Sequence, residues 1–287
     1  MSYAEIAERV VNLWNGCFAV ERPFLEQFKR YGIDYPIAVD QQRKGAQGRG
    51  VVEPDTEFVE CLANARIYAA PHLMQFAEAL DHESAAALRG HLTADHEVLV
   101  VDVGCAAGIL SLFADRAGFA HYIGVDTNRW MRLLSRAVFE SVMNDIAVKT
   151  DRPTFKILEH IDSQDGWCDD VRRVSANTDL SAPGARRLTV LLVMNHLVFQ
   201  RHDVARTVSS AIETCRGLAA LPGVHPYLVS IEPGTLYKPD RLGTRGLDGM
   251  LLERQLRVER YSVTGVKMLV TGNNKGDAAV RLVSFSA

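Results

Sequence analysis

The sequence predicts an α/β fold: a mostly parallel sheet with a C-terminal antiparallel hairpin, preceded by an N-terminal helical segment. From residue 96 onward, short apolar runs alternate with patterns of helical period. The strongest runs are apolar throughout, which is typical of strands buried on both faces of a parallel sheet. Only a short polar stretch separates the last two runs, and such a connection indicates an antiparallel pair.

The N-terminal segment, residues 1–95, has helical periodicity. Its first apolar face consists of Ile6, Val10, Leu13, Trp14 and Cys17. The polar, glycine-bearing stretch 41–50 is predicted to be a loop. Helical patterning resumes over 56–92, and Pro71 is expected to interrupt it because proline cannot donate a helical hydrogen bond.

Residues 96–287 account for the sheet. Five parallel strands are predicted at 96–104, 120–126, 154–162, 188–196 and 226–234. Helices are predicted at 109–118, 128–143 and 201–218. This alternation implies right-handed crossovers between parallel strands. The terminal hairpin is expected to pair 266–272 with 278–286.

Composition limits the classes of function. The chain of 287 residues has a net charge of −3, and its first 95 residues carry nine Lys/Arg against fourteen Asp/Glu, which argues against a grip on phosphate backbones. The five cysteines form no CxxC pair, so neither a metal site nor a disulfide framework is expected. No apolar run has membrane-spanning length and the N-terminus has no signal pattern, so we expect a cytoplasmic protein without membrane contact.

The most informative stretch is VVDVGCAAG, residues 100–108, where an apolar strand meets a turn of small residues. Glycine permits a sharp turn and a close approach of backbone to a ligand. The spacing is Gly104-x-Ala106-x-Gly108, and Ile109 stands where a dinucleotide motif has its third glycine. The alternative is a turn whose small residues serve only helix–strand packing.

This turn and the strand order resemble the Rossmann-like fold of class I S-adenosylmethionine-dependent methyltransferases, whose motif reads acidic-x-G-x-G-x-G. The resemblance covers roughly residues 96–287 and implies S-adenosylmethionine as the cofactor. It implies that Asp102 lies near the methionine end of that cofactor. The turn residues that it assigns to the cofactor are Gly104, Cys105, Ala106 and Gly108, with Ala106 in place of the middle glycine.

Further cofactor contacts are expected at the ends of the next strands. Asp126 ends the second strand, where a carboxylate can hold both ribose hydroxyls; its alternative role is to cap the helix that starts near Asn128. The resemblance implies that Asp162 contacts the adenine amino group, a solvated loop aspartate being the alternative. We also assign Thr127 and Met194 to the cofactor site.

The fourth strand ends in MNHLVF, at the place that faces the transferring methyl group in the family. His196 is a candidate proton acceptor, because the pKa of histidine lies near neutrality, and Asn195 could orient the nucleophile. Helix capping or packing is the alternative for His196. The stretch lacks the prolines of the [DN]-P-P-[YFW] motif, which disfavours methylation of an amino group on a DNA base.

The predicted function is S-adenosylmethionine-dependent methyl transfer, with a small-molecule substrate favoured and a specific RNA or protein substrate possible. Residues 1–95 would shape the substrate pocket. The arginine-bearing stretch 236–260 is either a substrate lid or a solvated connection. The alternative function is a methyltransferase-like binding or scaffold protein with weak or no catalysis. An NAD-dependent oxidoreductase is disfavoured by the missing third glycine.

Overall fold

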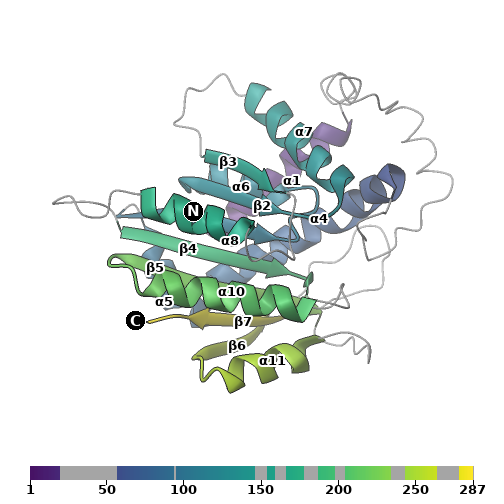
Figure 1. Ribbon diagram of the computed structural model, residues 1–287. Coiled ribbons are helices and arrows are strands. Elements are labelled where there is room, and N and C mark those ends of the chain that lie inside the picture. The colour runs from purple at the N-terminus through teal and green to yellow at the C-terminus, as the bar shows by residue number, and fades with distance from the viewer. Residues whose placement is uncertain are drawn as a thin grey trace.

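The computed structural model describes residues 1–19, 57–93, 95–145, 154–158, 166–177, 187–197, 204–233, 243–263 and 278–286. A seven-stranded sheet of order β3-β2-β1-β4-β5-β7-β6 forms its centre (Figure 1). Its strands are β1 (His96–Val103), β2 (His121–Val125), β3 (Thr154–Leu158), β4 (Arg187–Asn195), β5 (Val224–Pro233), β6 (Val258–Val263) and β7 (Ala278–Ser284). Strands β1 to β5 are parallel, and β7 runs antiparallel to both β5 and β6. The predicted mostly parallel Rossmann-like sheet with a C-terminal antiparallel pair is confirmed.

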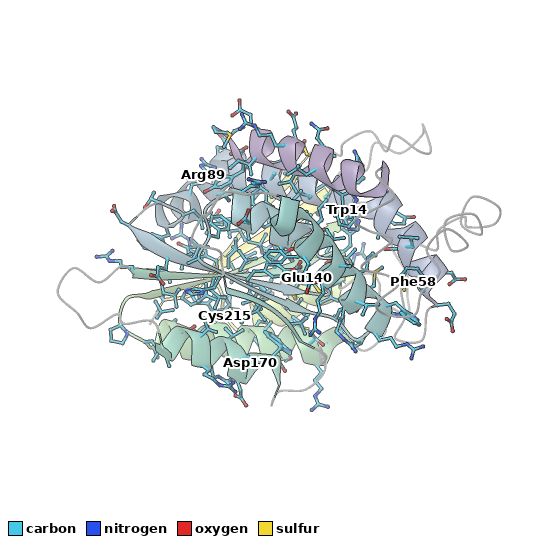
Figure 2. All side chains as sticks on the ribbon, turned by 90° about the horizontal axis from the view of Figure 1, so that it is seen from above. Trp14, Phe58, Arg89, Glu140, Asp170 and Cys215 are labelled. Atoms are coloured by element: carbon cyan, nitrogen blue, oxygen red, sulfur yellow. The ribbon has the colours of Figure 1, made fainter. Side chains whose placement is uncertain are left out.

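Helices cover both faces of the sheet (Figure 1). The first face carries α1 (Tyr3–Ala19), α4 (Phe58–Asp81), η1 (Glu83–Ala85), α5 (Ala86–His91), α6 (Ile109–Arg116) and α7 (Arg129–Asp145). The second face carries α8 (Trp167–Asn177), α10 (Val204–Ala219) and α11 (Gly243–Glu253). Figure 2 shows Trp14 and Cys215 on opposite sides of the sheet. Helix α8 is not among the helices predicted from the sequence.

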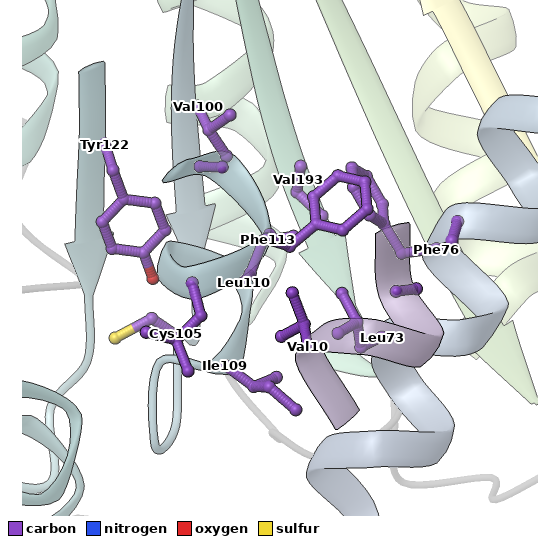
Figure 3. Close-up of a cluster of buried hydrophobic side chains, with 14 of the residues drawn as sticks. Val10, Leu73, Phe76, Val100, Cys105, Ile109, Leu110, Phe113, Tyr122 and Val193 are labelled. Atoms are coloured by element: carbon purple, nitrogen blue, oxygen red, sulfur yellow. The ribbon is translucent and has the colours of Figure 1, made fainter. Parts of the chain in front are cut away.

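Strand alternation divides the core into two apolar clusters. In β1, Val98 and Val100 face the first cluster, while Leu99 and Val101 face the second. Burial on both faces explains the continuous apolar run from Val98 to Val101 in β1. Figure 3 shows part of the first cluster, in which Val10, Leu73 and Phe76 of the N-terminal helices share one apolar core with Val100 and Val193 of the sheet.

The N-terminal helices share this first core with the sheet. Ile6, Val10 and Trp14 of α1 are buried, as predicted. Leu13 is an exception, because it is 36% exposed and so lies outside the buried face assigned to it from the sequence. The predicted loop at 41–50 and the side chain of Cys17 lie outside what the structure describes.

Helix α4 is continuous through Pro71, contrary to the predicted interruption. A proline inside a helix removes one backbone hydrogen bond and crowds the preceding turn. Buried side chains on both sides of Pro71, among them Leu62 and Phe76, hold the two halves of α4 against the same core. Tertiary packing therefore overrides the local cost of the proline.

The first strand of the terminal pair also differs from its predicted place. The described partner of β7 is Val258–Val263, whereas the predicted stretch 266–272 lies outside the described residues. Strand β6 lies at the edge of the sheet and is largely exposed, so it carries charged residues. It therefore lacks the apolar run by which the other strands were predicted. None of the described helices is both long enough and apolar enough to cross a lipid bilayer.

Candidate functional site

The candidate site lies where the winding of the sheet reverses. Strands β2 and β3 follow β1 toward one edge, while β4 and β5 lie on its other side. In open α/β sheets, ligands bind at such a switch point, beyond the carboxyl ends of the strands. The turns after β1 and β4 meet here, because a Cβ on Gly104 would lie 3.0 Å from Cδ1 of Leu197.

The turn after β1 contains three residues with left-handed backbone conformation. Their φ values are 78° at Gly104, 46° at Ala106 and 71° at Gly108. The backbone N–H groups of Gly104 and Cys105 both donate to the carbonyl of Val125, at 2.8 and 3.0 Å. The turn is thereby tied to the end of β2.

Gly108 is required for close packing of this turn against α7. A Cβ at Gly108 would lie 2.8 Å from Cβ of Ser135, closer than side chains normally approach. The structure thus gives Gly108 a packing role, which was the alternative for the turn. Its predicted contact with the cofactor stays a prediction.

Asp126 organises the turns after β1 and β2 together. Its Oδ2 accepts from the backbone N–H of Ala106 at 2.9 Å, and its Oδ1 accepts from that of Asn128 at 2.8 Å. The cap of α7 is Asn128, whose Oδ1 accepts from the N–H groups of Trp130 and Met131 at 2.8 and 3.0 Å. Asp126 therefore holds the preceding turn and lies two positions before the capping residue.

Arg132 of α7 adds to this clamp. Its Nη1 donates to the carbonyls of Asp126 and Thr127, at 2.9 and 2.8 Å. Thr127 is half-buried in the turn. The backbone around both predicted cofactor residues is therefore held in place before any ligand binds.

Asp102 is buried beside the turn and bonded to a residue that sequence reasoning missed. The hydroxyl of Tyr122 donates to its Oδ2 at 2.9 Å. The pKa of Asp102 is raised to about 7, because burial outweighs the hydrogen bond from Tyr122, which lowers the pKa, and the nearby charge of Asp126 adds to the rise. Burial also raises the pKa of Cys105, so that this side chain stays a thiol at neutral pH. Only strand pairing reveals Tyr122, which lies opposite Val100 on β2.

Helix α4 meets the end of β4 through His72 and Gln75, two residues that were not predicted to belong to the site. Asn195 Nδ2 donates to the carbonyl of His72 at 3.0 Å, and His196 Nε2 lies 3.0 Å from Oε1 of Gln75. The rings of His72 and His196 are stacked, with centroids 4.0 Å apart. His72 and Gln75 are three positions apart in a predicted helix, a spacing that puts them on one face and could have signalled a pair.

The contacts define the chemistry of His196. Because Gln75 offers an oxygen, His196 Nε2 donates and Nδ1 retains a lone pair. Burial lowers the pKa of His196 to about 4. Burial and the neighbouring His196 also lower the pKa of His72. His196 has a φ of 58°, so its backbone is left-handed, a conformation that often accompanies functional sites.

Asn195 contributes an acceptor. Its Oδ1 is buried and makes no hydrogen bond within the described part of the chain. A buried carbonyl oxygen without a partner is costly unless a ligand supplies a donor. This oxygen could therefore receive an N–H or O–H group of a substrate.

Of the remaining predicted residues, Met194 lies at this edge by its position, near the end of β4 and opposite Val103 of β1. The side chain of Met194 is fully buried in the second core cluster, and Asp162 lies outside the described residues. In the basic stretch, Arg260 pairs with Asp248, and Arg281 of β7 joins the same carboxylate. These charges face acidic partners within the chain.

Comparisons with known proteins complete the description. No family model and no curated protein matches the sequence. Among solved structures, the chain is similar to the precorrin-6y C5,15-methyltransferase of Geobacter metallireducens GS-15, at 11% identity over 71% of this chain and 89% of that chain, with a TM-score of 0.41. It is similar to a SAM-dependent methyltransferase of Aquifex aeolicus, at 14% identity over 76% and 97% of the two chains, with a TM-score of 0.37.

A third similar structure is the N-terminal domain of human METTL16 in complex with SAH, at 11% identity over 76% of this chain and 71% of that chain, with a TM-score of 0.44. The names of the first two describe methyltransferases, and the third structure holds SAH. The assignment of the fold rests on the strand order of this chain.

Proposed function

We propose that this protein transfers the methyl group of S-adenosylmethionine to a nucleophile, with a small molecule as the favoured substrate. The observation that carries the proposal is the clamped left-handed turn at the switch point, with Asp126 bound to Ala106 and Asp102 buried beside it. Two carboxylates suit a ligand that carries an ammonium group and a ribose. The first turn of α6 supports this choice over a dinucleotide, since Ile109 and Leu110 are buried apolar residues.

The residues present fit the cofactor. Asp126 would accept from the ribose hydroxyls, because each carboxylate oxygen can accept more than one hydrogen bond. Asp102 would face the ammonium group in its ionised form. Because its pKa is raised to about 7, we expect cofactor affinity to fall as the pH drops below 7.

The chain's own groups at β4 would position the nucleophile. Bound S-adenosylmethionine supplies an electrophilic methyl group, and transfer depends mainly on alignment. Asn195 is held by His72 and offers Oδ1 to a donor on the nucleophile. His196 offers Nδ1 as a neutral hydrogen-bond acceptor. Because its pKa is about 4, His196 is a weak base. We therefore expect a nucleophile that loses its proton easily, or that loses it only after it has received the methyl group.

Two observations support a small-molecule substrate over RNA or protein. The first 95 residues are acidic in balance. Arg260 and Arg281 share Asp248, which reduces the charge available to a nucleic acid. The low pKa of His196 favours the second candidate, a binding protein with weak catalysis, because this histidine is a poor base at neutral pH.

Titration of the full chain with S-adenosylmethionine and S-adenosylhomocysteine by calorimetry tests the proposal. Asp126→Ala should weaken binding by about 1–3 kcal/mol through lost hydrogen bonds to a charged group. The control is Asp95→Ala, at an exposed position next to the start of β1. Absence of binding at millimolar ligand would refute the cofactor assignment. Binding without transfer of labelled methyl to any extract component would favour the second candidate.

Asp126 also holds the turn, so a second measurement isolates its contact with ribose. Affinities for adenosine and 2′,3′-dideoxyadenosine are compared in the wild type and in Asp126→Asn. If the carboxylate holds the hydroxyls, the wild type prefers adenosine and the variant loses most of that preference. Equal loss of affinity for both ligands would assign Asp126 a role in the turn alone.

A further inference from the structure

Three histidines meet at the amino-terminal edge of the sheet, opposite the candidate cofactor site. His91 ends α5, His96 begins β1 and His225 is near the start of β5. The ring centroid of His91 lies 5.1 Å from that of His96 and 4.4 Å from that of His225. The centroids of His96 and His225 are 5.5 Å apart. We call these residues the histidine cluster.

The sheet register explains this meeting. Strand β4 lies between β1 and β5, with Arg187 beside His96 and Thr189 beside His225. The side chains of His96, Thr189 and His225 lie on the first face of the sheet, where His91 reaches them from α5. All three rings are half-buried and so remain within reach of solvent ions.

Hydroxyl groups hold two of the rings by their Nδ1 atoms. Tyr227 Oη lies 2.7 Å from His91 Nδ1, and Thr189 Oγ1 lies 3.0 Å from His96 Nδ1. Thr189 donates its only hydroxyl hydrogen to the carbonyl of His91, at 2.8 Å. His96 Nδ1 must therefore be the donor to Thr189, which leaves a lone pair on His96 Nε2. Metal-binding histidines are commonly held in this way through the nitrogen that does not bind the metal.

The spacing of the rings matches that of three imidazoles around one ion. A histidine nitrogen lies about 2.0–2.1 Å from Zn²⁺, so each ring centre lies about 3.2 Å from the ion, and two centres on a tetrahedral ion lie about 5 Å apart. The three observed separations, 4.4, 5.1 and 5.5 Å, surround this value. We propose that His91, His96 and His225 form a binding site for one divalent transition-metal ion of the Zn²⁺ class.

Binding requires the rings to turn. His91 and His96 are stacked with an interplanar angle of 18°, and within the described ranges no three ligating side chains already converge on one point. The ring centres need little movement, and the rotations must be small enough that Nδ1 of His91 and of His96 stays within hydrogen-bond distance of its hydroxyl group while Nε2 turns toward the ion. We therefore expect the metal to replace the stacked arrangement with a convergent one.

The local charges set the pH and salt dependence of this site. Burial lowers the pKa of His91, His96 and His225, and nearby Arg187 lowers each of them further. Asp95 acts in the opposite direction on His96. Protonation of the rings competes with the metal ion, so binding should weaken as the pH falls. Arg187 repels a bound cation, so Arg187→Gln should tighten binding, most clearly at low salt.

Calorimetric titration of the tag-free full chain with Zn²⁺ at pH 7.5 tests the site. We expect one equivalent to bind to the wild type and that equivalent to be lost in His225→Gln. The matched control is His121→Gln, a histidine at the start of β2 that contacts Glu97 and lies outside the histidine cluster. Tyr227→Phe, which removes only the hydroxyl that holds His91, should weaken binding by about 10–100-fold.

A second readout covers a variant that folds poorly. Zn²⁺ should raise the Tm of the wild type, because the site joins α5, β1 and β5, and it should raise the Tm of His121→Gln equally. Absence of an equivalent in the wild type, or its persistence in both His225→Gln and His91→Gln, would overturn the proposal. The three rings would then be a stack with a purely structural role.

Discussion

Ala106 is the residue at which this chain departs from the motif that it resembles, and its backbone explains why glycine is usual there. Its φ is 46°, a conformation that costs an ordinary residue about 1–2 kcal/mol. The N–H of Ala106 donates to Asp126, and this bond helps to maintain the conformation. The methyl group therefore adds backbone strain to the turn.

Ala106→Gly should increase the free energy of unfolding by about 0.5–1 kcal/mol, because relief of the strained φ exceeds the extra entropy of glycine in the unfolded chain. Urea denaturation measures the change. The neighbouring Ala107 is buried and has no positive φ, so Ala107→Gly should be destabilising. Equal effects of the two substitutions would contradict the strain argument.

Gly108 combines a left-handed backbone with close packing. Gly108→Ala should lower the free energy of unfolding by about 2–5 kcal/mol, since it adds strain and a clash with Ser135. Gly118 is a matched control, because its φ is 75° and a Cβ there would meet nothing within 4 Å. Gly118→Ala should cost only about 1–2 kcal/mol. Thermal unfolding compares the two, and Ser135→Ala should recover part of the loss if the clash is real.

At the scale of elements, the contact between α4 and the end of β4 couples the N-terminal helices to the candidate site. They are connected by the stack of His72 on His196 and by two hydrogen bonds, which His196 donates to Gln75 and Asn195 donates to the carbonyl of His72. Any movement of α4 would shift Asn195 and His196 together. Through this contact, the N-terminal segment could set the positions of Asn195 and His196 in the proposed substrate pocket.

The same contact predicts a pH dependence of stability. The pKa of His196 falls from 6.5 to about 4 on folding, so between these values the unfolded chain binds more protons. Its contribution to stability is therefore complete above pH 6.5 and decreases as the pH falls toward 4, by about 3 kcal/mol at most. Asp102 acts oppositely: its raised pKa adds stability below pH 3.8 that is lost as the pH rises through about 7.

Comparison of variants separates these two opposed contributions. Urea denaturation at several pH values between 4 and 7 should show that His196→Gln loses less stability than the wild type on acidification. Asp102→Asn should instead remove the contribution of Asp102 to the free energy of unfolding, which in the wild type decreases as the pH rises toward 7. An unchanged difference between wild type and His196→Gln across this range would show that the histidine is protonated equally in both states.

At the scale of the whole molecule, the two predicted regions share one core. Residues of α1 and α4 fill the first apolar cluster together with strands β1, β4 and β5. A chain that lacks residues 1–95 would expose this face of the sheet to water. The division of the chain near residue 95 into a pocket-shaping region and a cofactor-binding region stays a prediction. The side chains on the two sides of this boundary pack in one apolar cluster.

Trp14 measures how much this shared core contributes. Trp14→Ala should lower the free energy of unfolding by about 3–5 kcal/mol, because a fully buried indole would leave a cavity against the sheet. Leu13→Ala changes the adjacent, 36% exposed residue and should cost less than about 1 kcal/mol. Calorimetric unfolding should show a single transition in both variants. A second transition for Trp14→Ala would indicate that the N-terminal helices unfold independently.

Sequence patterns predicted the sheet well where they reflect local burial. Short apolar runs, strong for β1 and β4 and weaker for β3, located β1 to β5, and the small residues 104–108 located the turn after β1. Prediction failed at β6, where charged residues cover an exposed edge strand, and at Pro71, where packing holds the helix together. Local pattern carries no information on those two outcomes, because both depend on what lies beside the segment.

The sequence by itself determined the succession of strands β1 to β5 along the chain and the turn of small residues at 104–108, because backbone preference and burial period act over a few residues. Only the tertiary structure decided that Tyr122 bonds to Asp102, that His72 stacks on His196 and that three histidines gather at the opposite edge. These partners are far apart in the chain, and the lowered or raised pKa values follow from their shared burial. Packing between distant segments creates both the contacts and the low-polarity surroundings that shift the charges.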